Sequence, residues 1–150
     1  MPPIIKLYEA FGCIADGRIE MMPFSAQVFS SSRAKFYTVI WDGNDHLMCN
    51  DNGSFWQGYL GYPAIAFLCL KGLLPYSEFA ANALKDIAWK DINENNKNDF
   101  GKTLDEVRKI VTARGVDFSS VQADVETTYA AMRFMPFHLL GNKLKPPQGY

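Results

Sequence analysis

The sequence has little excess of charge of either sign and no long hydrophobic run. Lys and Arg number 15 and Asp and Glu number 16 among 150 residues, so the formal net charge is −1. Proteins that bind nucleic acid usually carry a clear excess of Lys and Arg, so nucleic acid is not favoured as a partner. The longest apolar run, residues 64–70, is far shorter than the ~20 residues that cross a bilayer, so we expect no membrane partner.

Cysteine and histidine are scarce. The cysteines Cys13, Cys49 and Cys69 are odd in number and form no CxxC pair, and the only histidines are His46 and His138. Disulfide scaffolds and structural zinc sites need more of these residues at paired spacings. The first residues also lack the charged and apolar regions of a signal peptide. We therefore expect reduced thiols, a cytoplasmic location, and neither a metal nor a cofactor.

The common catalytic motifs are also absent. The sequence contains no GxSxG, P-loop or GxGxxG pattern. Cys13 or Cys49 could act as a nucleophile with His46 or His138 as the base. No spacing in the sequence favours one of these pairs over another. The sequence assigns no catalytic residue. It favours a protein that is not an enzyme, with catalysis left open.

The pattern of apolar residues predicts an α+β fold. We expect an N-terminal helix, an antiparallel β-meander, then a buried helix and three amphipathic helices. The predicted elements are a helix over 3–15, strands at 18–22, 26–30, 35–41 and 46–49, a loop over 50–61, and helices over 63–72 and about 78–92. Two capping boxes, one from Thr103 to Glu106 and one from Ser119 to Gln122, are expected to start the last two helices.

The chain length predicts a single domain over residues 1–141. Its β-rich part covers about 17–50 and its helical part about 63–136. The remaining residues, 142–150, have no apolar periodicity, so we expect a flexible tail.

The segment 35–72 resembles a SWIM-type zinc finger. Its predicted hairpin ends at Cys49-Asn50-Asp51, and Tyr62-Pro63-Ala64 opens an apolar helix. In that family a hairpin carries a Cys-x-Cys pair and the following helix begins with Cys-x-His. Here Cys49 matches the first ligand, whereas Asp51, Tyr62 and Ala64 occupy the other three positions. The resemblance implies a finger that has lost its metal, from a family associated with binding DNA or proteins.

The loop before the buried helix is rich in aromatic residues and glycines. Phe55, Trp56, Tyr59 and Tyr62 lie within eight positions of one another. Trp and Tyr are frequent in the energetic centres of protein interfaces, although aromatic rings also fill cores. We favour a non-catalytic protein-interaction module that uses these four residues, with the exposure of the loop left open.

Two other interpretations remain. The first is a small enzyme or small-molecule binder with a pocket between sheet and helices, for which Cys49, His46 and Asp51 are the reactive or ligand candidates. The second is a nucleic-acid-binding protein that uses the loop aromatics with Arg33, Lys35 or the predicted helix that starts at the Thr103 box, because aromatic rings stack on unpaired bases. The sequence leaves the identity of the partner and the oligomeric state open.

Overall fold

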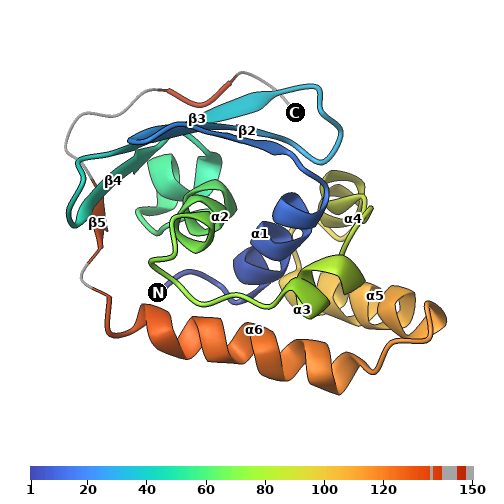
Figure 1. The fold of residues 1–150 in the computed structure, drawn as a ribbon. Helices are drawn as coiled ribbons and strands as arrows, with labels where there is room; N and C mark the ends of the chain where they lie inside the picture. Colours follow the sequence, from blue (N-terminus) through green and yellow to red (C-terminus); the bar gives the residue numbers. More distant parts are fainter. Residues whose placement is uncertain (136, 140–144, 148–150) are drawn as a thin grey trace.

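The computed structural model describes residues 1–135, 137–139 and 145–147 (Figure 1). Residues 142–144 and 148–150 of the predicted tail lie outside the described residues. The structure has an N-terminal helix, an antiparallel four-stranded meander and several later helices, so the predicted α+β fold is confirmed. In the part of the chain that is described, no helix combines the length and apolar character needed to cross a membrane.

The sheet contains the four predicted strands in chain order. They are β1 (Ile19–Met21), β2 (Ser25–Phe29), β3 (Phe36–Trp41) and β4 (His46–Cys49). Ala26 pairs with Val39, and Val39 pairs with Cys49, so these three buried side chains lie on the same inner face. A two-residue strand, β5 (His138–Leu139), adds in parallel to β4. It was not predicted, because two residues carry no readable periodicity.

Two helices lie under the inner face of the sheet. They are α1 (Ile5–Ala15) and α2 (Tyr62–Leu70). Every residue from Pro63 to Cys69 in α2 is buried, as its uniformly apolar sequence predicts. Figure 1 shows α6 (Phe118–Met132) on the far side of these two helices from the sheet. The core is therefore formed between the sheet and α6.

The prediction of a single helix over 78–92 is wrong. The structure has two helices there, α3 (Glu78–Ala83) and α4 (Trp89–Asn95), so in the described part of the chain four helices and not three follow α2. Asp86 lies between them in the left-handed region, with φ of 58°, and its N–H donates to Asp16 Oδ1 at 2.7 Å. The break turns the chain so that Trp89 is buried.

The two predicted capping boxes do not start the last helices. α5 (Phe100–Ala113) begins earlier, where Asp99 accepts a hydrogen bond from Lys102 N at 3.3 Å. Asp117 caps α6 by accepting from Ser119 N at 3.2 Å. Asp is as good an N-cap as Ser or Thr. Thr103 is instead buried, and its hydroxyl donates to Asn93 Oδ1 at 3.0 Å.

The predicted loop over 50–61 contains one helical element. This element, η1 (Gly53–Gln57), is a turn of π-helix that ends at Gly58 with φ of 73°. Such turns are rare and occur often at functional sites.

The contact of α1 with α4 predicts opposite effects for two helical glycines. A Cβ at Gly12 would lie 2.9 Å from both Leu84 O and Trp89 Nε1, whereas a Cβ at Gly101 in α5 would meet only Asp99 Oδ1, at 3.4 Å. We expect Gly12→Ala to lower the free energy of unfolding by about 1–3 kcal/mol through overpacking. Gly101→Ala should leave it unchanged or raise it by up to about 1 kcal/mol, because Ala favours helix. Urea denaturation measures both, and equal stability of the two variants would contradict the packing of α1 on α4.

Candidate functional site

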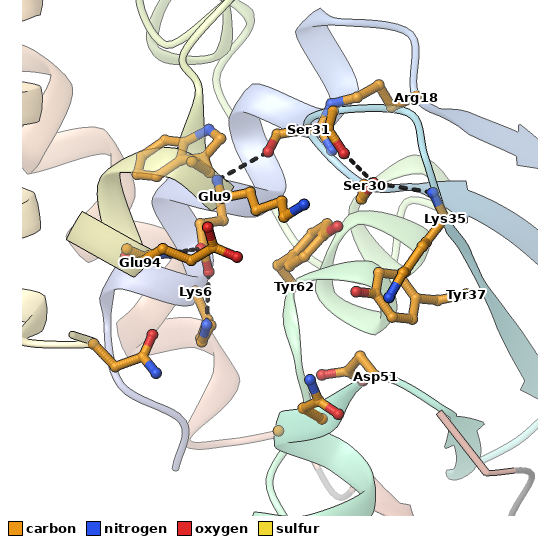
Figure 2. Close-up of a pocket in the computed structure, with 17 residues that line it drawn as sticks. Lys6, Glu9, Arg18, Ser30, Ser31, Lys35, Tyr37, Asp51, Tyr62 and Glu94 are labelled. Carbon is orange, nitrogen blue, oxygen red and sulfur yellow. Dashed lines mark hydrogen bonds and ion pairs between the residues drawn. The ribbon is translucent and has the colours of Figure 1, made fainter. Parts of the chain in front are cut away.

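A polar pocket lies where α1, α4, the turn between β2 and β3, and the start of η1 meet. Its volume is about 150 Å³. Figure 2 shows side chains from these segments, and Tyr62 at the start of α2, around a common space. Charged and hydroxyl groups predominate in the lining, among them Lys6, Glu9, Arg18, Tyr37, Asp51 and Tyr62.

Glu9 brings a carboxylate into the pocket from the middle of α1. The residue is 4% exposed, Oε1 accepts from Asn93 Nδ2 at 2.7 Å, and Oε2 lies 2.9 Å from Lys6 Nζ. Burial acts to lower the pKa of Lys6, but the Glu9 carboxylate outweighs it and the pKa is raised. Lys6 is therefore a cation at neutral pH, and the pair joins α1 to α4 through Asn93.

Arg18 brings a guanidinium to the opposite end of the pocket. It is 2% exposed, its Nε lies 3.0 Å from Asp16 Oδ2, and Nη1 donates to Phe29 O at 2.7 Å. Its Cζ lies 5.9 Å from the centroid of the Tyr62 ring. Burial raises the pKa of Tyr62 well above its ordinary value, although the charge of Arg18 acts in the other direction. Tyr62 therefore presents a neutral phenol at physiological pH.

Asp51 lines the pocket just after β4. It is 7% exposed, and its Oδ2 accepts from Ser54 N at 3.2 Å. Its backbone oxygen accepts from Phe55 N at 2.9 Å, so the residue also supports the start of η1. A Cβ at Gly61 would overlap this carboxylate, so glycine is required there. Among the described residues, Asp51 Oδ1 has no hydrogen-bond partner.

Unusual backbone conformations gather around this pocket. The described non-glycine residues with positive φ are Arg33 (60°), Asp86 (58°), Lys97 (52°) and Asn98 (60°). Asn98 lines the pocket, and Arg33 and Asp86 line an adjoining hollow that shares Arg18 with it. A left-handed residue other than glycine costs roughly 1–2 kcal/mol, and such residues cluster at functional sites.

The structure divides the four predicted aromatic binding residues between two places. Trp56 is 68% exposed and meets the ring of Phe55 edge-on, with the centroids 4.6 Å apart. Tyr59 is half-buried and covers Gly53, whereas Tyr62 lines the pocket. The loop is thus partly surface and partly pocket wall.

The structure also separates the three predicted reactive or ligand candidates. His46 is half-exposed at the start of β4, Cys49 is buried at the other end of the strand, and Asp51 belongs to the pocket. His46 Nδ1 lies 2.7 Å from Asp45 Oδ1 and 3.4 Å from Asp42 Oδ2. In the part of the chain that the structure describes, Asp42, Asp45 and His46 form the group of three side chains close enough to share a metal ion. Their own hydrogen bonds in an exposed turn explain why they are close.

The sequence did not single out most of the pocket. Lys6, Glu9, Arg18, Lys90 and Asn93 resemble ordinary surface residues of helices and strand ends. The one available signal was Glu9, which follows Leu7 and Tyr8 in a helix that the apolar pattern buries on nearly every side.

The three thiols should be inert in the folded protein. Burial raises the pKa of Cys13 to about 11 and that of Cys69 to about 12. Burial, followed by the nearby Asp51 carboxylate, raises the pKa of Cys49 well above its ordinary value. Because the thiolate is the reactive form, we expect no reaction with a thiol reagent at neutral pH until denaturant is added. Rapid labelling of Cys49 in the native protein, located by mass spectrometry, would contradict this burial.

Substitutions in the aromatic loop should separate its exposed part from its packed part. We expect Trp56→Ala to change the free energy of unfolding by less than about 0.5 kcal/mol, because the indole is mostly exposed. Tyr59→Ala should lower it by more than about 1 kcal/mol, because the ring packs against Gly53. Chemical denaturation of the two single variants measures this, and the reverse order would show that Trp56 belongs to the core.

A family model matches nearly the whole chain. The model described as "Uncharacterised conserved protein UCP014422" covers residues 1–138, and the chain belongs to this family. No curated protein and no solved structure gave a match. The family match overturns the resemblance to a SWIM-type zinc finger. The geometry agrees, because Tyr62 lines the pocket and Ala64 is buried in α2, where that finger would place metal ligands.

Proposed function

We propose that this member of the UCP014422 family binds a small polar molecule in the pocket beside Glu9, Arg18 and Asp51. The supporting observation is that these three charged side chains, each less than a tenth exposed, reach one pocket from separate segments. Burying an ionised group costs several kcal/mol, and replacing buried ion pairs by apolar residues is often neutral or stabilising. Buried charged residues that do not stabilise the fold are expected at sites where they are retained because they bind a ligand.

The size and chemistry of the pocket limit the ligand. A volume of about 150 Å³ is similar to that of a cavity that holds benzene, so the pocket matches a ligand of roughly six to ten non-hydrogen atoms. Carboxylates, ammonium groups and the neutral phenol of Tyr62 in the lining provide both acceptors and donors. Most of the lining residues are charged or carry a hydroxyl or amide group, which favours a ligand with several polar groups. A cytoplasmic location is part of the proposal and is supported by three free, buried cysteines.

A ligand screen with two matched lysine variants tests the proposal. Lys90 lines the pocket, and its backbone N–H donates to Ser31 Oγ at 2.9 Å, a bond that survives loss of its side chain. Lys85 is exposed and lies outside the pocket lining. We expect small polar metabolites of up to about ten non-hydrogen atoms to include compounds that raise Tm of the wild-type protein.

In that screen the Lys90→Ala variant should lose most of the increase in Tm, whereas Lys85→Ala should retain it. Both variants should unfold at the wild-type temperature without a ligand, because neither side chain is part of the core. If no compound stabilises the wild-type protein, or if both variants respond as the wild type does, the pocket is not the binding site.

The exposure of Trp56 supports a second candidate function, contact with a protein partner through Trp56 and the neighbouring ring of Phe55. Exposed Trp side chains next to a second ring are typical of interface centres. A pull-down with wild-type, Trp56→Ala and Phe79→Ala baits tests this, since Phe79 is also an exposed aromatic residue but lies on α3. We expect the wild-type and Phe79→Ala baits to recover a partner protein that the Trp56→Ala bait does not recover. Equal recovery with all three baits would contradict this function.

A further inference from the structure

We infer that the ligand of the polar pocket is a small zwitterion of the α-amino acid type, whose ammonium group binds Asp51 and whose carboxylate lies at the Lys90 and Arg18 end. This inference rests on the proposed function and names the class of ligand. It depends on which charged groups of the pocket already have partners and which do not.

The acceptor for the ammonium group is Asp51 Oδ1. More than nine-tenths of this residue is buried, and among the described residues this oxygen receives no hydrogen bond. A buried carboxylate oxygen without a donor is unfavourable, so a ligand that donates there gains more than it would at an exposed carboxylate. An ammonium group supplies both the hydrogen-bond donor and the opposite charge.

The other carboxylates are already engaged or exposed. Glu9 Oε1 accepts from Asn93, and Glu9 Oε2, which like Asp51 Oδ1 receives no hydrogen bond among the described residues, forms an ion pair with Lys6 at 2.9 Å. Asp16 pairs with Arg18. Glu94 lines the pocket but is exposed, so water solvates it. Asp51 is therefore the buried acid of the pocket that a ligand cation would neutralise.

The donors for the ligand carboxylate lie at the other end. Figure 2 shows Arg18 and Ser31 on one side of Tyr62 and Tyr37, and Asp51 on the other. Among the described residues, the Arg18 guanidinium donates from Nε to Asp16 and from Nη1 to Phe29 O, which leaves the N–H groups of Nη2 for a ligand. The backbone of Lys90 lies at this end of the pocket, because its N–H donates a hydrogen bond to Ser31 Oγ. Among the described residues, the Lys90 ammonium has neither a hydrogen bond nor an ion pair.

A metal ion is a poorer occupant than an organic cation. Hard cations need several oxygen ligands around one point. Within the described part of the chain, the acids that line the pocket do not belong to a group of three or more side chains close enough to share an ion. An α-amino acid also matches the pocket in size, since the smaller members have roughly six to ten non-hydrogen atoms.

Matched sets of compounds test this inference on the wild-type protein. The common α-amino acids are screened by calorimetry, and the tightest binder is compared with its 2-hydroxy acid, which lacks the amine, and its amino alcohol, which lacks the carboxylate. Each analogue should bind about tenfold to a hundredfold more weakly, because each loses one charge-assisted hydrogen bond. This comparison needs no variant that must fold.

Two variants then assign the ends of the ligand. Asp51→Asn keeps the size of the side chain and an acceptor for Ser54 N, and it should abolish the preference for the amino acid over the hydroxy acid. Lys90→Ala should reduce the preference for the amino acid over the amino alcohol. It should leave the preference for the amino acid over the hydroxy acid unchanged. A merely structural role of Asp51 would weaken all three compounds equally.

The outcomes separate this inference from the function on which it rests. If other polar metabolites stabilise the protein but no amino acid binds, the pocket still binds a ligand and the zwitterion is wrong. The zwitterion is equally wrong if an amino acid and its hydroxy acid bind with the same affinity. If no compound of any class binds, the proposed function fails as well.

Discussion

The hydrogen-bonded cluster of Lys6, Glu9, Asn93 and Thr103 is the contact on which the pocket depends. Glu9 is buried on α1, and its carboxylate is compensated by the Lys6 ammonium and the Asn93 amide. Asn93 in turn accepts from the Thr103 hydroxyl at 3.0 Å, so three helices meet at one buried carboxylate. Removing one partner would leave a buried charge uncompensated, which costs more than the hydrogen bond itself contributes.

The short helix α4 shows why this contact matters. It has only seven residues, and isolated helices shorter than ~12–15 residues are marginal in water. Its position therefore depends on tertiary contacts. Trp89 packs against Gly12, the backbone of Lys90 donates to Ser31, and Asn93 binds Glu9. All three contacts involve residues that line the pocket, so the contacts that hold α4 in place also position the pocket's side chains.

The turn between β2 and β3 provides the facing wall, and Arg18 fixes it. Its guanidinium joins Asp16 to the backbone of Phe29, while Arg33 in the turn donates to Asp16 O at 2.9 Å. Asp16 also accepts from Asp86 N, and that bond fixes the break between α3 and α4. One carboxylate at the end of α1 thus orients both the sheet side and the helix side of the pocket.

Local patterns predicted the parts of the fold that depend on local chemistry. The meander follows from runs of aromatic and β-branched residues and from the Asp42-Gly43 turn, and α2 follows from its uniform apolarity. The break at Asp86 was not predictable, because its partner Asp16 lies 70 residues away in the sequence. The caps at Asp99 and Asp117 were missed because both candidate boxes contain good cap residues used for other purposes.

The candidate site was predictable only in fragments. Asp51 was identified as a ligand candidate and Tyr62 as an aromatic contact, and both line the pocket, but nothing in the sequence joined them to Glu9 or Arg18. Their convergence depends on long-range packing of α1 against α4. The zinc-finger resemblance was wrong because a hairpin followed by an apolar helix is a common arrangement, and the metal ligands that would distinguish it are absent.

The position of a bound ligand is the most direct measurement of the central claim. The ¹⁵N-labelled protein would be titrated with the compound that stabilises it most, and the backbone amide shifts followed. Binding in the pocket predicts the largest changes at Ser31, Asn52 and Asn93, on three separate walls. Changes confined to Phe55 and Trp56, or spread evenly over the surface, would contradict a ligand site built around the buried charges.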